Sequence, residues 1–228
     1  MPKSTFLNLS EEKRQAFLDR ALEEFGLHGY RKASVSNIVK SLEIAKGSVY
    51  QYFDHKADLY RYLVEYAASK KLDYIAAHPS LLSLGTGESD FFTRYRAIVL
   101  AGAEFDFRFP AFSLVIANAG KERDAQDIPE LAAELNERST RFLSQFVQAG
   151  IERGQLRNDI DPLLLAHSIN SLTLAIVGYL ESRFSFSLPQ LLRDQSDGLP
   201  HALPFTNAEL EAAVDGLISV LQQGISRP

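Results

Sequence analysis

Apolar residues recur three and four positions apart over most of the 228-residue chain, a spacing typical of amphipathic helices. The first clear run extends from Phe17 to Phe25 and ends near Gly29. Ser10 precedes two glutamates, which is the pattern of a helix N-cap with acidic residues in the first turn. The chain is therefore predicted to be nearly all helix.

Turn-forming residues divide the remaining sequence into further helices. Gly85 and Gly87 lie in the clearest linker-like segment, residues 80–89, because glycine favours turns. Residues 185–205 contain three prolines and are predicted as a loop with one helical turn at 188–193. The predicted helices cover residues 34–41, 46–53, a long stretch that ends before Pro79, 91–107, a stretch that begins at 111, 128–153, 162–183 and 207–226.

Three helix starts carry recognisable capping signals. Asp161 stands before Pro162, and proline is tolerated in the first turn because its missing N–H has no partner there. The segment 127–129, Asp-Ile-Pro, repeats the same device. Thr206 has a glutamate three residues later, which predicts a capping box.

Residues 34–53 have the spacing of a helix-turn-helix, in which a turn of about four residues joins two short helices. Such a motif requires a rigid corner. The apolar side chains that can lock this corner by packing are Ile38, Val39, Ile44, Val49 and Phe53. The opposite face of the second helix is polar and carries Lys46, Gly47, Ser48, Tyr50, Gln51 and Tyr52.

Each residue type on this polar face suits contact with a DNA duplex. Gly47 allows the backbone to approach DNA closely, and Ser48 and Gln51 can read base edges. The lysine at the start of the helix and the tyrosine hydroxyls can reach phosphates. The alternative interpretation is that the tyrosines are only core aromatics of a helical protein.

Four groups of residues agree in type and spacing with a known family: Phe25–Tyr30, Ser34–Ile38, Lys46–Phe53, and Lys56 with Leu59. Together they resemble the N-terminal signature of the TetR family of transcriptional regulators, and the match runs over residues 10–62 without a gap. The resemblance implies an all-α protein with two domains. Residues 1–55 would form a three-helix DNA-binding domain with the helix-turn-helix, and residues 56–228 a larger helical ligand-binding and dimerisation domain.

The same resemblance implies a set of DNA contacts. These are phosphate contacts from Ser36, Tyr50, Tyr52 and Lys56, and major-groove contacts from Lys46, Gly47, Ser48 and Gln51. The turn departs from the family pattern at Glu43 and Ala45, where a glycine and a capping serine are usual. Each change costs about 1 kcal/mol if the geometry is kept, and Glu43 also adds a negative charge near the DNA side.

Charge is distributed unevenly along the chain. Residues 1–78 carry 12 lysines and arginines against 10 acidic residues, whereas residues 79–228 carry 12 against 19. A mildly basic N-terminal part and an acidic C-terminal part suit a DNA-binding module attached to a domain that does not contact DNA. The net charge of −5 argues against a protein that coats nucleic acid non-specifically.

Other compositional features exclude several kinds of site. The chain has no cysteine, which excludes disulfides, thiolate zinc sites and thiol nucleophiles. The five histidines are scattered, so we expect no metal and no cofactor. No apolar segment follows Met1, and polar residues interrupt the longest apolar run, residues 163–180. We therefore expect a cytoplasmic protein without a membrane span.

The second domain is predicted to hold a small effector and a dimer interface. The resemblance implies a four-helix homodimer interface formed by the helices at 162–183 and 207–226, whose apolar faces are wider than one domain needs. An excess of phenylalanines suggests a pocket for a small apolar or aromatic effector; the alternative is ordinary core packing. The candidate ligand-binding residues are Tyr95, Phe105, Phe112, Asn118, Phe142, Phe146, His167 and Asn170.

These features predict a ligand-responsive transcriptional regulator that binds a palindromic double-stranded operator as a dimer. Repression is commoner in the family than activation, and the sequence does not distinguish between the two. Two rival hypotheses are a helical interaction module without DNA binding, which Glu43 favours, and an enzyme. Tyr66 and Lys70 have the YxxxK spacing of short-chain dehydrogenases, but no glycine-rich strand-to-helix loop precedes them, so we expect no catalysis.

Overall fold

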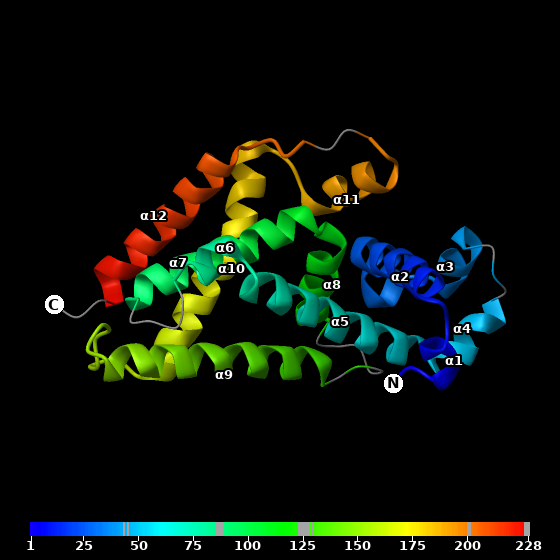
Figure 1. Cartoon of the computed structure of the whole chain (residues 1–228), viewed down its shortest axis with the longest axis horizontal. Coiled ribbons are helices and arrows are strands. Elements are labelled where there is room, and N and C mark those ends of the chain that lie inside the picture. The colour runs from blue at the N-terminus through cyan, green and yellow to red at the C-terminus, as the bar shows by residue number, and fades with distance from the viewer. Residues whose placement is uncertain are drawn as a thin grey trace. The chain divides into compact units, whose positions relative to one another are not determined.

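The computed structural model describes residues 1–42, 44, 46–84, 89–122, 128, 130–199 and 202–225, and the backbone alone of residues 46, 132 and 136. Within this part every regular element is a helix (Figure 1), which confirms the predicted all-α fold. The helices are α1 (Ser4–Leu7), α2 (Glu11–Lys32), α3 (Val35–Ser41), α4 (Lys46–Tyr52), α5 (Lys56–Ala76), α6 (Pro79–Leu82), α7 (Phe91–Arg108), α8 (Pro110–Lys121), α9 (Leu131–Glu152), α10 (Pro162–Phe184), α11 (Leu188–Ser196) and α12 (Asn207–Ile225).

Local capping explains why several helices begin where the sequence predicts. The Ser10 hydroxyl accepts the N–H of Lys13 at 3.4 Å at the start of α2. The Asp161 carboxylate accepts the first two free N–H groups of α10, at 2.8 and 3.0 Å. In the capping box of α12, the Thr206 N–H donates to the Glu209 carboxylate at 2.7 Å, and the Glu209 N–H donates to the Thr206 hydroxyl at 3.3 Å. The starts of α2, α10 and α12 are therefore defined by residues within or next to each helix, without contacts from distant segments.

Three segments contain more helix than predicted, and one of them is the four-residue α1, which was not predicted at all. α11 has nine residues where the sequence suggested one turn, and Leu188, Leu191 and Leu192 are buried along it. Their spacing forms one apolar stripe. Burial of this stripe stabilises the helix although prolines and polar residues surround it. The short helix α6 lies at the edge of the predicted linker, with Pro79 in its first turn. Of the start signal at 127–129, only Ile128 lies within the described residues, and α9 begins at Leu131.

The chain packs into two compact units, and each draws on separated segments. Unit 1 comprises Met1–Lys71, Phe109–Glu134 and Leu188–Leu199; unit 2 comprises Leu72–Arg108, Leu135–Ser187 and Pro200–Pro228. Helices α8 and α11 therefore pack with the N-terminal helices although they are distant in sequence. The functional boundary between residues 55 and 56 stays a prediction, since packing alone does not define it.

Aromatic side chains hold the N-terminal helices of unit 1 together. Phe6 of α1 lies at the centre, with its ring centroid 5.7 Å from that of Phe17, 5.0 Å from Phe53 and 5.6 Å from Tyr62. Such edge-on and tilted pairs add stability beyond the area that they bury. The cluster thereby joins α1, α2, α5 and the end of α4.

The most extensive helix packing in unit 1 joins α2 to α8. It depends on Gly26 of α2, where an added Cβ would lie 3.3 Å from the Ala111 carbonyl oxygen and 3.4 Å from the side chains of Leu114 and Leu192. The missing side chain thus allows α2 to approach α8 and α11 closely.

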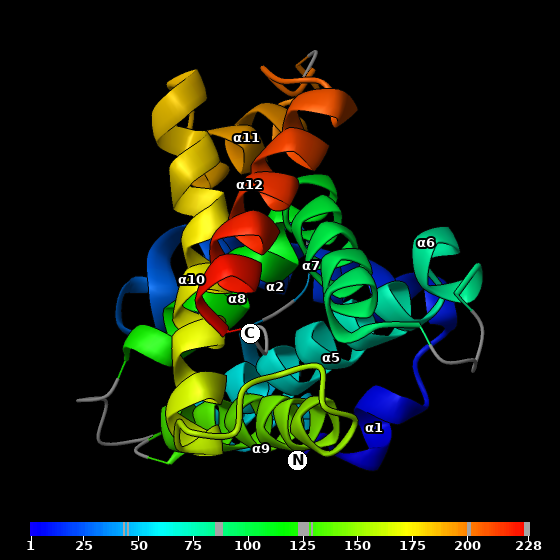
Figure 2. The ribbon, with the colours of Figure 1, turned by 90° about the vertical axis from the view of Figure 1, so that its left-hand side faces the viewer.

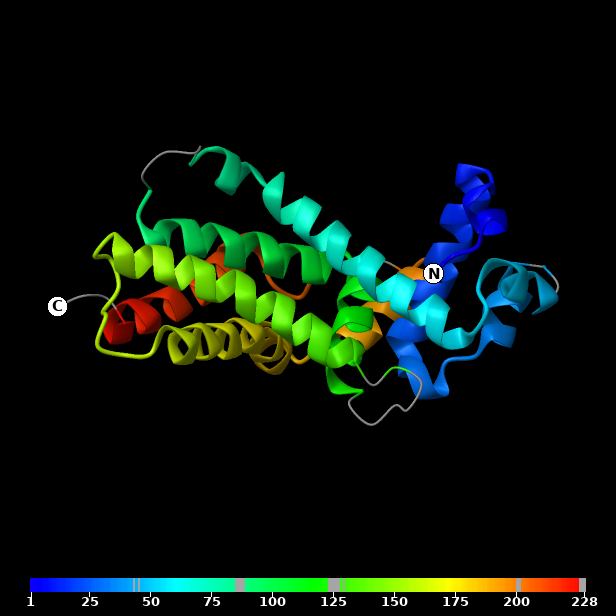
Figure 3. The ribbon, with the colours of Figure 1, turned by 90° about the horizontal axis from the view of Figure 1, so that it is seen from below.

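Helix α7 forms the centre of unit 2. It packs against α10 and α12 (Figure 2) and also against α6. Most of its residues are buried, including Phe91 and Tyr95, as expected for a helix covered on several sides. The Phe91 ring lies 4.6 Å from the ring of Phe146 on α9, the helix that runs beside α7 (Figure 3). The Arg96 guanidinium forms an ion pair with Asp215 of α12.

Replacing Gly26 with leucine should lower the free energy of unfolding by about 1–3 kcal/mol, because the new side chain has no room between α2, α8 and α11. Gly47→Ala is the matched control, since no described atom lies within 4 Å of a Cβ at Gly47. It should leave the free energy of unfolding unchanged or raise it by up to about 1 kcal/mol. Urea denaturation measures both changes, and a Gly26→Leu variant as stable as the parent would contradict the close packing.

Candidate nucleic-acid interface

The corner between α3 and α4 is formed by buried apolar side chains, as predicted. Ile38, Val39, Val49 and Phe53 are all buried, and Ile44 is half-buried. The backbone closes the end of α3, where the N–H groups of Leu42 and Ile44 both donate to the Val39 carbonyl at 3.2 Å. Glu43 and Ala45, the two departures from the family pattern, lie outside the described residues.

The N-terminal segment closes the C-terminal end of α4. The Lys3 N–H donates to the Tyr52 carbonyl, and its ammonium donates to the Tyr50 carbonyl, each at 2.8 Å. The Thr5 hydroxyl donates to the carbonyl of Gln51. The last carbonyls of a helix have no partner within it, and a cation there also compensates the helix dipole. Lys3 further pairs with Asp54 at 2.7 Å, so this arm fixes the end of α4.

The outer face of α4 is open and polar. Gly47 and Gln51 are exposed, Ser48 is half-buried, and Tyr50 is 45% exposed. Ser36 lies exposed on α3. The side chain of Lys46 lies outside the described part of the chain. Four predicted DNA-contacting residues of α4 and one of α3 are therefore at least partly accessible to solvent.

Tyr52 differs from Tyr50 in its surroundings. Its ring centroid lies 5.8 Å from that of Phe6 and 5.7 Å from that of Phe17, and the side chain is half-buried. The ring is thus part of the aromatic packing of unit 1, and the predicted phosphate contact of Tyr52 stays a prediction.

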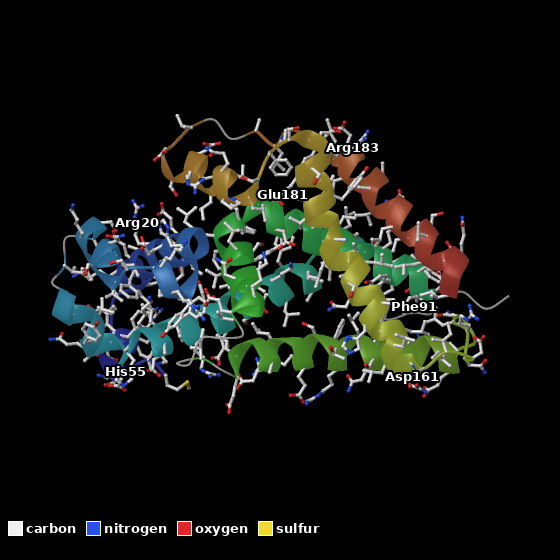
Figure 4. The ribbon with its side chains drawn as sticks, turned by 180° about the vertical axis from the view of Figure 1, so that it is seen from behind. Arg20, His55, Phe91, Asp161, Glu181 and Arg183 are labelled. Atoms are coloured by element: carbon white, nitrogen blue, oxygen red, sulfur yellow. The ribbon has the colours of Figure 1, made fainter. Side chains whose placement is uncertain are left out.

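A cationic hollow lies beside this face at the start of α5. It has a volume of about 590 Å³ and is lined by Tyr30, Arg31, His55, Lys56 and Ala57. The Lys56 ammonium lies 4.8 Å from the centre of the Tyr30 ring and donates to the Arg31 carbonyl at 3.3 Å. His55 lies in the turn between α4 and α5 (Figure 4). Positive side chains around an open hollow suit an anionic group such as a phosphate.

The predicted ligand-binding residues do not form one group. Phe112 and Asn118 belong to unit 1, and the other six belong to unit 2. Asn118 is already bonded to two carbonyls of α2. His167 and Phe142 are exposed. The positions of these residues on their helices did not indicate which of them share a cavity.

Part of the set does lie at one cavity of unit 2. This cavity has a volume of about 170 Å³ between the start of α7 and the end of α9, and its lining residues are Ser89, Phe91, Arg94, Phe146, Ala149, Gly150, Arg153 and Gln155. The buried Tyr95 ring lies 6.1 Å from the ring of Phe146, and Phe142 stacks on Phe146 at 6.4 Å. Figure 4 shows Phe91 and Asp161 at the same end of this unit, and Glu181 and Arg183 at the other end of α10.

Comparison with known proteins agrees with this architecture. Residues 17–63 match the family model described as bacterial regulatory proteins, tetR family. A TetR family transcriptional regulator from Chloroflexus aurantiacus is 29% identical, with a TM-score of 0.79 over 100% of both chains. Residues 17–63 therefore form a TetR-family N-terminal domain, and the whole chain shares the fold of a TetR-family regulator.

Two more distant structures share the TetR fold. A second TetR regulator from Chloroflexus aurantiacus is 22% identical, with a TM-score of 0.64, and the match covers 96% of this chain and 98% of the other. A transcriptional regulator from Saccharomonospora viridis in complex with choline is 16% identical, with a TM-score of 0.61, over 96% and 100% of the two chains. Comparison with curated proteins gives no match.

The TetR-family N-terminal domain and the observed helix-turn-helix support a DNA-binding transcriptional regulator. The sequence analysis missed one component of its DNA-binding domain, the arm formed by Lys3 and Thr5. Neither periodicity nor spacing indicates this arm, because its hydrogen bonds join residues that are more than 40 positions apart. Phe6, an apolar residue next to the arm, is the local sign that the segment packs against the domain.

The different surroundings of the two tyrosines on α4 predict different effects on stability. Tyr52→Ala should lower the free energy of unfolding by about 1–3 kcal/mol, somewhat less than for a fully buried aromatic residue. Tyr50→Ala should change it by no more than about 0.5 kcal/mol, as is usual for surface substitutions. Chemical denaturation of the two variants side by side measures both values, and equal losses would show that the Tyr50 ring also packs in the core.

Proposed function

We propose that this TetR-family protein is a ligand-responsive repressor. It binds a palindromic operator as a homodimer in the cytoplasm and is released by a small apolar or aromatic effector. The observation that supports this proposal most strongly is the polar outer face of α4, which is open to solvent while the opposite face is buried in the corner with α3. An interaction module without DNA binding would not require such a face.

On the DNA side, each proposed contact follows from the chemistry of the residue. Gln51 and Ser48 read base edges in the major groove, while Gly47 permits close approach of the backbone. Ser36 and Tyr50 hold phosphates. The proposed set is completed by Lys46, Tyr52 and Lys56.

The proposed dimer interface uses α10 and α12. Exposed apolar side chains on these helices are Leu163, Leu164, Leu172, Leu174, Tyr179 and Val220. Helix α10 is also long and apolar enough to cross a membrane, and only 28% of its most apolar window is buried. His167 is exposed on the same helix, and an ionisable residue facing lipid is costly. A second copy of the chain therefore suits this face better than a membrane does, because the same patch is then buried on both subunits.

The proposed effector site is the cavity of about 170 Å³ between α7 and α9. Phe91 and Phe146 line it, and Tyr95 and Phe142 extend the aromatic group, which favours an apolar or aromatic molecule. The Saccharomonospora regulator binds choline, a small organic molecule, in the same fold. Release requires the effector to bind more tightly to the DNA-free arrangement than to the DNA-bound one, since equal binding shifts no equilibrium.

Selection of bound duplexes from a random pool tests DNA recognition directly. The unmodified protein should select a palindrome, and the affinity should fall about 10³-fold between roughly 50 and 200 mM salt when about six phosphate contacts form. Gln51→Ala should weaken binding about 5- to 150-fold, the value of a well-formed base contact. Gln148→Ala removes another exposed glutamine, on α9, and should have no effect. Failure to select any duplex would support the interaction-module hypothesis.

A charge placed on the exposed face of α10 tests the dimer. Leu174 is 71% exposed in the single chain, and Leu174→Glu should weaken self-association roughly a hundredfold or more, because an unpaired charge buried in an interface costs several kcal/mol. Leu72→Glu changes a similarly exposed leucine on α5 (64% exposed) and should leave the dimer intact. Sedimentation over a concentration series measures both, and a dimeric Leu174→Glu protein would contradict the assignment.

A further inference from the structure

The cavity between α7 and α9 has room for one aromatic ring. Its volume is about 170 Å³, and an engineered apolar cavity of about 150 Å³ in another protein binds benzene. The rings of Phe91 (Figure 4) and Phe146 form part of the wall, with their centroids 4.6 Å apart. Tyr95 lies 5.7 Å from Phe91 on the same aromatic wall. A single ring with one small substituent therefore fits, whereas a fused-ring system or a long acyl chain does not.

The turn at the end of α9 holds this wall in place. A Cβ at Gly150 would lie 2.9 Å from the side chains of both Phe91 and Leu156, so α7 approaches α9 closely at this glycine. The N–H groups of Gln155 and Leu156 both donate to the Gly150 carbonyl, at 2.9 and 3.3 Å. These bonds fold the chain back and keep Arg153 and Gln155 beside the aromatic wall.

The backbone at the start of α7 is already satisfied and offers nothing to a ligand. The Asp90 carboxylate accepts the N–H groups of Phe92 and Thr93, at 3.0 and 3.1 Å. The Phe91 N–H donates to the Gln155 side-chain oxygen at 3.0 Å. A molecule in the cavity must therefore be recognised by side chains.

The polar side chains that remain at the cavity can donate hydrogen bonds. Because the Phe91 N–H can only donate, the Gln155 amide must turn its oxygen toward it, and the amide NH₂ group has no partner among the described residues. The Ser89 hydroxyl is buried and likewise has no partner in the part of the chain that the structure describes. A buried hydroxyl without a partner costs free energy, and an acceptor on a ligand would remove that cost.

The charge around the cavity is positive. Among the described residues that line it there are two arginines, Arg94 and Arg153, and no acidic residue. An arginine covers an apolar wall with its methylene stem and keeps its guanidinium toward water. Arg153 is exposed and Arg94 is half-buried, so we expect both guanidiniums at the mouth. A cationic ligand would gain from the aromatic faces, but these like charges would repel it, whereas they attract an anion.

We propose that the effector of this cavity is a small aromatic carboxylate with a single ring. The ring lies against Phe91 and Phe146, and the carboxylate lies at the mouth, where it accepts hydrogen bonds from Arg153, Arg94 and Ser89. Guanidinium groups suit this task because they bind carboxylates through two parallel hydrogen bonds. This inference rests on the proposed function, because it names the chemical class of effector for the same cavity.

Titration of the full chain with three single-ring probes, followed by protein NMR, tests the chemical class. Benzoate carries the negative charge, benzamide has nearly the same shape without it, and benzylamine carries a positive charge. Benzoate should bind about tenfold more tightly than benzamide, because hydrogen bonds to charged groups are worth more than neutral ones. Benzylamine should bind more weakly than both.

Two variants test the positions of the charge and of the ring. Arg153→Gln should weaken benzoate binding about tenfold and leave benzamide binding unchanged, and the exposure of Arg153 makes loss of the fold unexpected. Arg138→Gln is the matched control, since it removes another exposed arginine of α9 that does not line the cavity, and it should change neither affinity. Ala149→Leu fills the cavity and should abolish the binding of both probes.

Equal affinities for benzoate and benzamide would overturn the proposal, as would an Arg153→Gln protein that binds benzoate like the parent. Binding of none of the probes would overturn it together with the assignment of the cavity as the effector site. The titrations need no DNA, so their outcome is separate from that of duplex selection. Benzoate that binds as expected but leaves the affinity for the selected duplex unchanged would overturn the effector role in the proposed function and confirm the carboxylate site alone.

Discussion

The corner between α3 and α4 is the constraint on which the DNA-binding surface depends. Buried Ile38, Val49 and Phe53 fix the angle between the two helices. Hydrogen bonds from the N-terminal arm to backbone carbonyls fix the far end of α4. A seven-residue helix is too short to be stable alone. Packing on one side and capping at the end therefore stabilise α4. Its polar face is not needed for folding and stays open to bind a partner.

The sequence predicts best the features that neighbouring residues determine. Asp161 and the Thr206–Glu209 pair define helix starts through bonds to backbone two or three residues away, so they are visible in the sequence. The ligand-binding residues were predicted less well. Phe105 and Phe142 both have helical spacing, yet one is buried and the other exposed. Periodicity indicates an apolar face, but it does not indicate which helix covers that face.

The features that sequence reasoning missed all depend on distant segments. The arm at Lys3 bonds to α4, Asn118 bonds to α2, and Leu192 of α11 packs near Gly26. In each case a polar or small residue gains its role from a helix far away in the chain. Asn118 illustrates this well, because its place on an apolar helix suggested a ligand contact, whereas its amide serves two backbone carbonyls.

The central claim is that the open face of α4 enters the major groove of DNA, once from each of two subunits. A crystal structure of the protein bound to its selected duplex tests it most directly. The account predicts Gln51 and Ser48 at base edges and the two α4 helices about 34–36 Å apart, one turn of the duplex. A complex in which α4 lies outside the groove, or in which a different surface contacts the bases, would contradict it.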